Sequence, residues 1–178
     1  MDALPNIAAV KSRTILDHQL CIRPLRGDDR EALRRLLIET QVFTLDEMDI
    51  ALELIDVVLD RPDQKDYIIS TYEDDGEVLG YYCIGPTPAT DGTFDLYWIA
   101  VHPSVHGSGV GGALDRHAEQ LIRSLGGRLV IAETSSGPRY EGTRRFYLRH
   151  GYAELARIPD YYRPGDGLVV YGKYLHSL

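Results

Sequence analysis

The chain has 178 residues, 44% of them hydrophobic, so it can bury a core of its own without disulfides or a structural metal. The formal net charge is -8, and no block is rich in lysine and arginine. Both features argue against a nucleic-acid partner, which would require a positive surface. No apolar run is long enough to cross a bilayer, so we expect a cytoplasmic protein without a membrane partner.

Residues 1–18 lack clear hydrophobic periodicity, and we expect them to form a tail or an arm ahead of one domain at residues 19–178. Within that domain, stretches with a period of two residues alternate with amphipathic stretches, one of which opens with a capping box of Thr44 and Glu47. The expected elements are, in chain order, a strand at Gln19–Pro24, helices after Asp28 and after Thr44, strands at Tyr67–Tyr72, Val78–Ile84 and Thr93–His102, a helix at Gly109–Leu125, a strand at Arg128–Thr134, a helix at Thr143–His150, and strands at Tyr152–Ile158 and Leu168–Leu175.

This element order predicts a mixed α/β (α+β) fold with a strand–helix–strand unit in its middle. The two cysteines, Cys21 and Cys83, lie in apolar stretches and are expected to be small buried residues. We expect no metal site, because no metal-ligand pattern appears and Pro103 interrupts the close histidine pair His102 and His106.

A glycine-rich loop, HGSGVGG at His106–Gly112, lies between a predicted strand and a predicted amphipathic helix. Glycines let the backbone approach a ligand closely, and the free amides at a helix start favour an anion. A plain turn needs only one or two glycines, so the four in this loop favour a ligand that carries phosphate.

One phosphate ligand that fits the loop is a dinucleotide. Gly107, Gly109 and Gly112 match the pattern G-x-G-x-x-G, and Glu133 lies where a ribose-binding acid would be expected. Three observations weaken this interpretation. Pro103–His106 separates the loop from the strand, a hairpin precedes the unit, and too few residues follow to build a doubly wound sheet.

The other phosphate ligand is an acyl-CoA, because the sequence resembles the GNAT superfamily of N-acetyltransferases over about residues 19–175. The run VHP at Val101–Pro103 followed by HGSGVG resembles the family's pyrophosphate loop. The run TRRFYLRHGY at Thr143–Tyr152 is similar to the family's C-terminal signature, and the element order agrees. His106 replaces the usual Gln or Arg, and Tyr140 stands where many members have an Asn.

The resemblance implies a single-domain GNAT fold, with a central mixed, mostly antiparallel sheet that is splayed between strands 4 and 5 and flanked by helices. It also implies acetyl-CoA as co-substrate, direct transfer without a covalent intermediate, Tyr147 as general acid, and Asp95 or Glu133 as general base. The acceptor would lie beside Tyr97, Glu133 and Tyr162. The residues expected to bind the cofactor are Ile99, Ala100, Val101, His106, Gly107, Ser108, Gly109, Val110, Gly111, Gly112, Tyr140, Thr143 and Tyr147.

The function expected from these features is transfer of an acetyl group from acetyl-CoA to a primary amine. A non-catalytic acyl-CoA-binding module is the alternative, and a dinucleotide-binding protein is a weaker one. The acceptor stays open between a small molecule and a protein, although the acidic charge favours a cationic acceptor. The sequence also leaves a homodimer open.

Overall fold

The computed structural model describes residue 10 and residues 13–175. Its helices are α2 (Ile15–Leu20), α3 (Asp29–Thr40), α4 (Leu45–Asp60), α5 (Val110–Ser124) and α6 (Glu141–Arg149), with short 3₁₀ turns η1 (Pro103–Val105) and η2 (Pro138–Tyr140). Its strands are β1 (Ile22–Pro24), β2 (Ile68–Asp74), β3 (Glu77–Pro86), β4 (Thr93–Val101), β5 (Leu129–Ser135), β6 (Ala153–Arg163) and β7 (Asp166–Tyr174).

The strands form a seven-stranded sheet in the order β1-β2-β3-β4-β5-β7-β6. β4 and β5 are parallel, whereas the pairs β1–β2, β2–β3, β5–β7 and β6–β7 are antiparallel. The expected mixed, mostly antiparallel sheet flanked by helices is therefore confirmed. A doubly wound dinucleotide-binding fold requires a parallel sheet, so the topology excludes that alternative.

The pairing between the parallel strands β4 and β5 is short. Its register covers Thr93–Asp95 against Leu129–Ile131, whereas β4 continues to Val101 and β5 to Ser135. Such a short register agrees with the expected sheet that is splayed between its fourth and fifth strands.

The chain divides into two compact units, and both β4 and α5 contribute residues to each of them. The first unit comprises Met1–Ile84 and Trp98–Ala118. The second comprises Gly85–Tyr97 and Glu119–Leu178. The glycine loop belongs to the first unit, and the residues expected to carry out the chemistry belong to the second.

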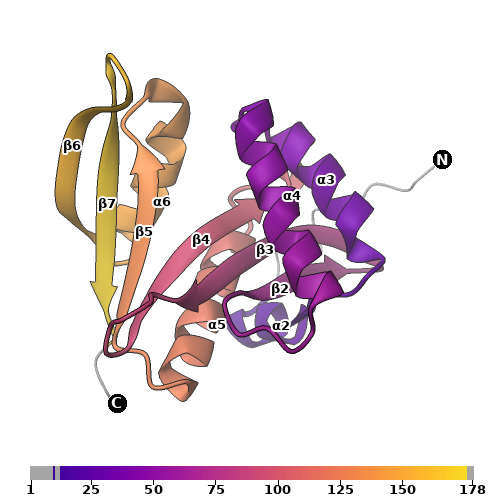
Figure 1. The fold of residues 1–178 in the computed structure, drawn as a ribbon. Coiled ribbons are helices and arrows are strands. Elements are labelled where there is room, and N and C mark those ends of the chain that lie inside the picture. The colour runs from indigo at the N-terminus through magenta and orange to yellow at the C-terminus, as the bar shows by residue number, and fades with distance from the viewer. Residues whose placement is uncertain (1–9, 11–12, 176–178) are drawn as a thin grey trace. The chain divides into compact units, whose positions relative to one another are not determined.

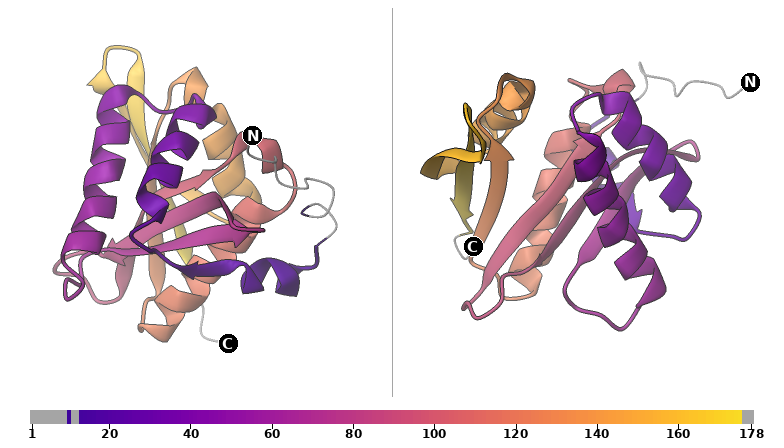
Figure 2. Two further views of the ribbon diagram at one scale, coloured as in Figure 1. Left: turned by 90° about the vertical axis from the view of Figure 1, so that its right-hand side faces the viewer. Right: turned by 45° about the horizontal axis from the view of Figure 1, so that its top comes forward.

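In the first unit, α3 and α4 lie side by side and cover one face of β2 and β3 (Figures 1 and 2). α5 packs on the opposite face, because a Cβ added at Gly80 in β3 would lie 2.9 Å from Cδ1 of Leu114. The core under α3 and α4 is made of buried side chains from both helices and three strands: Leu33, Leu36, Leu37, Ala51, Ile55, Ile69, Tyr81, Cys83 and Ala100.

The cysteines differ in environment. Cys83 is 1% exposed, and burial raises the pKa of its thiol to about 12, so the prediction of a buried cysteine is confirmed there. Cys21 is partly exposed, and its Sγ accepts a hydrogen bond from Nη1 of Arg13 at 2.9 Å. The prediction of burial is therefore only partly right for Cys21.

Two helices begin with a reciprocal capping box. At α4 the amide of Glu47 donates to Oγ1 of Thr44 at 3.3 Å, and the amide of Thr44 donates to the Glu47 carboxylate at 2.7 Å, as predicted. At α2 the amide of Asp17 donates to Oγ1 of Thr14 at 3.2 Å, and the amide of Thr14 donates to the Asp17 carboxylate at 2.9 Å. The second box was not predicted, and it accounts for an error in the first strand.

The predicted strand at Gln19–Pro24 begins too early. Gln19 and Leu20 form the end of α2, because the capping box commits the chain to a helical turn, and β1 starts at Ile22. Helix α2 also crosses the expected boundary between tail and domain at residue 18. Residues 1–9 and 11–12 of the expected tail lie outside the described residues.

In the second unit, β7 pairs with both β5 and β6, and α6 packs beside β5 and β7 (Figure 1). The last strand pair is longer than predicted, because β6 continues through Tyr161 and Tyr162 to Arg163. The turn residues from Arg163 to Gly167 suggested a loop there, but a register shift between Ile158 and Arg163 lets β6 continue past Pro159.

Candidate active site

The glycine loop is a compact turn between η1 and α5. Gly107 and Gly109 have φ angles of 74° and 98°, which a residue with a Cβ adopts only with strain. Ser108 between them is 8% exposed, and both its hydroxyl and its amide donate to the carbonyl of Val105, at 2.6 and 3.2 Å. The loop therefore has a defined backbone path that its glycines make possible.

The loop leads directly into the amides at the start of α5. The first helical hydrogen bond runs from the amide of Ala113 to the carbonyl of Gly109 at 2.9 Å. The amides of Val110–Gly112 precede that bond, so the helix offers them to a ligand, with the positive end of its dipole behind them. Val110 is fully buried and fixes the first turn to the core. Such an arrangement suits a phosphate or pyrophosphate group.

His106 is exposed at the start of the loop, and its Nε2 lies 2.9 Å from the carbonyl oxygen of Val101 in β4. Since a carbonyl can only accept, the ring donates this bond and carries its proton on Nε2. His106 thus fixes the loop to the end of β4. Of the strand residues expected to line the cofactor, Ile99 and Val101 are half-buried, and Ala100 is 5% exposed in the core.

Two expected acids lie on one face of the second unit's sheet. Asp95 is half-buried, and Oδ2 accepts hydrogen bonds from Thr87 Oγ1 at 2.8 Å and from the Tyr97 hydroxyl at 3.4 Å. Asp95 pairs with Ile131, and alternation along β5 places Glu133 on the same face as Ile131. Glu133 is exposed. The structure therefore brings Asp95, Tyr97 and Glu133 to one face.

Tyr147 lies in α6 and is 4% exposed. Its ring packs against the rings of Tyr152 and Tyr171, with centroids 5.2 and 5.5 Å away. Tyr171 in β7 pairs with Ala132, the neighbour of Glu133, so Tyr147 and Glu133 belong to opposite faces of this part of the sheet. The proton donor and the exposed carboxylate that the sequence suggested are thus separated by the sheet itself.

A family model described as an acetyltransferase (GNAT) domain matches residues 65–154. A solved GNAT-family protein from Desulfovibrio desulfuricans is 41% identical and superposes with a TM-score of 0.81, over 86% of this chain and 97% of that one. The chain belongs to the GNAT acetyltransferase family.

Two more distant acetyltransferases share the fold. The ribosomal-protein-S18-alanine N-acetyltransferase of Escherichia coli has a TM-score of 0.70 at 15% identity, over 88% of this chain and 94% of that one. An aminoglycoside 6'-N-acetyltransferase, solved in complex with coenzyme A, has a TM-score of 0.69 at 16% identity, over 88% and 98%. A comparison with curated proteins gives no match.

Two further cofactor residues expected of a GNAT acetyltransferase, Tyr140 and Thr143, are half-buried around the start of α6. Sequence analysis missed the side chain that fixes this segment. The Arg144 guanidinium donates to the carbonyls of Ser135 and Gly137, at 2.7 and 2.8 Å, and so joins the end of β5 to η2. Its signal was one of the two adjacent arginines in the TRRFY run, and nothing in the sequence separates it from an ordinary exposed arginine.

Tyr162, expected near the acceptor, lies in β6 and is 51% exposed. Its ring makes an edge contact with that of Tyr161 at 5.0 Å. All the residues of β6 are exposed. The role of Tyr162 beside the acceptor stays a prediction.

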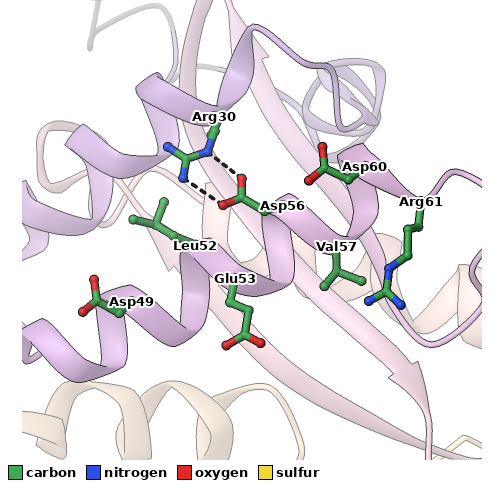
Figure 3. A pocket seen from close by; sticks show the side chains of 8 residues that line it. All are labelled: Arg30, Asp49, Leu52, Glu53, Asp56, Val57, Asp60 and Arg61. Atoms are coloured by element: carbon green, nitrogen blue, oxygen red, sulfur yellow. Dashed lines mark hydrogen bonds and ion pairs between the residues drawn. The ribbon is translucent and has the colours of Figure 1, made fainter.

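A hollow on the first unit runs along the outer surface of α4 (Figure 3). Arg30 of α3 donates two hydrogen bonds to Asp56, at 2.5 and 2.8 Å, so the Arg30 guanidinium already occupies part of the hollow. The lining residues are Arg30, Asp49, Leu52, Glu53, Asp56, Val57, Asp60 and Arg61. Charged side chains at this helical spacing are typical of a solvated helix face, and we assign the hollow no catalytic role.

Sequence analysis also missed the contacts of α2, through His18 with the glycine loop and through Gln19 with the first turn of α5. The available signal was the sequence TILD, in which Thr14 and Asp17 make the capping box. The described residues hold no group of three or more His, Cys, Asp or Glu side chains suited to a metal ion. Among the described helices, none has the length and hydropathy that a membrane crossing requires.

Proposed function

We propose that this GNAT acetyltransferase moves an acetyl group from acetyl-CoA directly to a primary amine. The observation that carries the proposal is the glycine loop with the amides of Val110–Gly112 at the start of α5. Those amides suit the pyrophosphate of CoA. Support also comes from the aminoglycoside acetyltransferase of the same fold, which was solved with coenzyme A.

The residues present fit such a ligand. Gly107 has open space where a Cβ would lie, and Gly111 and Gly112 add no side chain that could block the amides. No acidic side chain occurs between His102 and Leu114, so no carboxylate of the loop would repel the phosphates.

For the chemical step, we assign Tyr147 the role of general acid, as the family resemblance implies. The amine nitrogen forms a bond to the acetyl carbonyl carbon, and the bond from that carbon to sulfur breaks. Tyr147 would give its phenolic proton to the departing thiolate, and Asp95 or Glu133 would take the proton lost by the amine, directly or through a water. After the two proton transfers the products are an amide and free CoA, so one proton is given and one is taken up.

The second unit keeps the candidate proton donor and a candidate proton acceptor apart. Tyr147 and Glu133 belong to opposite faces of the sheet. Asp95 accepts hydrogen bonds from Thr87 and Tyr97, whereas Glu133 faces solvent and can meet an incoming amine.

The acceptor class that we propose is a cationic amine, because the chain carries a formal net charge of -8. Relatives of the same fold act on very different amines, an alanine of a ribosomal protein and an aminoglycoside. A test panel therefore needs both a peptide with an N-terminal alanine and an aminoglycoside, together with a polyamine.

The test is calorimetric titration of the full chain with acetyl-CoA, with NADH as the control ligand. We expect binding of acetyl-CoA and no heat with NADH. An assay of free thiol release across the amine panel then separates an enzyme from a binding module. Silence with acetyl-CoA would overturn the proposal, and binding without thiol release from any amine would favour the non-catalytic module.

A further inference from the structure

The short helix α2 brings two polar side chains to the glycine loop and to the helix that follows it. Nε2 of Gln19 donates to the carbonyl of Ala113, in the first turn of α5, at 3.2 Å. His18, the preceding residue, is 3% exposed and contacts the loop itself. The start of α5 is therefore held from outside its own sequence segment.

The imidazole of His18 lies between strand β2 and the loop. Its Nδ1 is 2.8 Å from the hydroxyl of Tyr72, which is itself fully buried. Its Nε2 is 3.3 Å from the position that a Cβ on Gly109 would take. A hydrogen bond also joins the ring to the backbone of Ser108. The ring thus connects a rigid strand to the loop at the residues that precede the free amides.

The direction of these bonds follows from their effect on the ring. The bond to the Ser108 backbone raises the pKa of His18, so the ring is the donor and the Ser108 carbonyl the acceptor. Nε2 then carries the proton, and Nδ1 accepts from the hydroxyl of Tyr72. Burial outweighs this bond and lowers the pKa, so the imidazole is neutral and has one donor and one acceptor, each of them used.

The charged groups around the ring are consistent with that state. Arg13 lowers the pKa of His18, as does Arg116 of α5, whereas Asp17 of α2 raises it. A protonated ring would have to give up the bond from Tyr72, because its Nδ1 could no longer accept.

The position of the contact matters because the Ser108–Gly109 peptide directly precedes the free amides at the start of α5. Gly107 and Gly109, on either side of Ser108, have positive φ angles of 74° and 98°. The bond from His18 fixes the orientation of the Ser108 carbonyl and hence of the peptide that leads into Val110. Preorganised amides bind an anion better than amides that must first be ordered.

The same unit contains a second pair that serves as a natural control. Nδ1 of His117 in α5 also lies 2.8 Å from a tyrosine hydroxyl, that of Tyr82 in β3, and burial also lowers the pKa of His117. No described contact joins the His117 ring to the glycine loop. The two pairs share their chemistry and differ in whether they touch the loop.

We propose that His18 is a positioning residue for the acyl-CoA site, in which Tyr72 orients the imidazole and the imidazole holds the Ser108 carbonyl so that the amides of Val110–Gly112 face the pyrophosphate. This inference rests on the proposed function of the loop. It makes α2, which sequence analysis assigned partly to a tail, a working part of the cofactor site.

The test compares three variants of the full chain: His18→Leu, His18→Gln and His117→Leu. Calorimetry with CoA gives the Kd of each. We expect His18→Leu to raise Kd about tenfold, the value of about one buried hydrogen bond. His18→Gln retains an N–H donor toward Ser108, so we expect its Kd to stay within about threefold of the unchanged chain. His117→Leu should leave the Kd within about twofold of that of the unchanged chain, although it should lower thermal stability about as much as His18→Leu does.

Hydrogen exchange of the amides in residues 107–112 is measured on the same variants without ligand. We expect faster exchange in His18→Leu and unchanged exchange in His117→Leu. Equal Kd values for the two leucine variants, or no rescue by glutamine, would overturn the proposal. If the unchanged chain does not bind CoA, the proposed function fails by itself. The exchange rates then still decide whether His18 fixes the loop, and equal rates would refute that role.

Discussion

The two units hold their functional residues by different kinds of contact. In the first unit, hydrogen bonds fix the glycine loop: Ser108 bonds to a neighbouring carbonyl, and His106 bonds to the end of β4. In the second unit, ring packing holds Tyr147, through Tyr152 and Tyr171. The hydrogen bonds orient the backbone groups of the loop, and the ring packing fixes the position of the Tyr147 side chain.

This difference determines what a substitution can reveal. A hydrogen bond is lost when either partner is removed, and a buried partner left unpaired costs about 1–3 kcal/mol. Ring packing survives the removal of a hydroxyl, because most of the contact area belongs to the ring. Substitutions in the loop therefore change structure and binding together, whereas the hydroxyl of Tyr147 can be removed with its packing left intact.

The largest effect is expected for Gly109→Asp. The φ angle of 98° is strained for any residue with a Cβ, the Cβ would lie 3.3 Å from the ring of His18, and the carboxylate would add a negative charge to the loop proposed to bind the pyrophosphate. We expect the Kd for CoA to rise by about 10³-fold or more, since strain of about 1–3 kcal/mol adds to charge repulsion. Calorimetry with CoA measures it.

Two asparagine variants separate the causes. Gly109→Asn keeps the strain and the crowding without the charge, and it should weaken CoA binding less than Gly109→Asp does. Gly107→Asn has a φ of 74°, which asparagine adopts with less strain than most residues, and open space around its Cβ, so it should bind CoA nearly as well as the unchanged chain. Normal CoA affinity in Gly109→Asp would refute the assignment of the loop.

The next effect concerns ion pairs, one buried in the first unit and one exposed in the second. Arg23 donates to both carboxylate oxygens of Asp29, at 2.7 and 2.8 Å, and Asp29 is 3% exposed. Arg23→Met leaves that carboxylate buried without its cation, so we expect a loss of about 3–5 kcal/mol in the free energy of unfolding, measured in urea. Arg157→Met breaks the exposed pair with Glu154 and should leave the urea midpoint unchanged. Equal losses would show that the burial of the pair is not what matters.

A smaller effect is expected for Tyr147→Phe, which tests the second unit's side of the comparison. Removing the hydroxyl should lower kcat by about 10²-fold, the usual contribution of a general acid, with little change in the KM for acetyl-CoA or in thermal stability. Tyr152→Phe is the matched control, because its ring packs against that of Tyr147 and we assign it no proton transfer. Similar kcat values for the two variants would refute the role of Tyr147.

Much of the fold could be predicted because its signals are local. The capping box at Thr44, the stripe of apolar residues in α5 and the hairpin turn at Asp75-Gly76, with φ angles of 50° and 83°, each depend on residues close in sequence. The glycine loop was located for the same reason. The family signature then linked these local elements into one topology.

The parts that could not be predicted depend on tertiary contacts. α2 has six residues, too few for stability by itself, and the contacts of His18 with the loop and of Gln19 with α5 are visible only in the structure. The difference between half-buried Asp95 and exposed Glu133 also depends on neighbours far along the chain. Sequence patterns could therefore name the candidate acids without ranking them.

The smallest expected effect is a fall in the free energy of unfolding at acid pH, and Asp29 in the first unit should cause it. Burial alone would raise the pKa of Asp29, but the bonds from Arg23 and from the amide of Arg26 hold that pKa below its ordinary value. The unfolded chain therefore binds a proton at a higher pH than the folded chain does. Stability from this group is complete above the ordinary pKa of aspartate, about 3.9, and is lost as the pH falls below it.

Urea unfolding between pH 7 and pH 3 should show this loss, and Asp29→Asn should flatten the acid limb of the curve, although the variant is less stable at pH 7. A curve of unchanged slope in Asp29→Asn would assign the acid sensitivity to other carboxylates and would remove the energetic distinction between the buried pair and the exposed one.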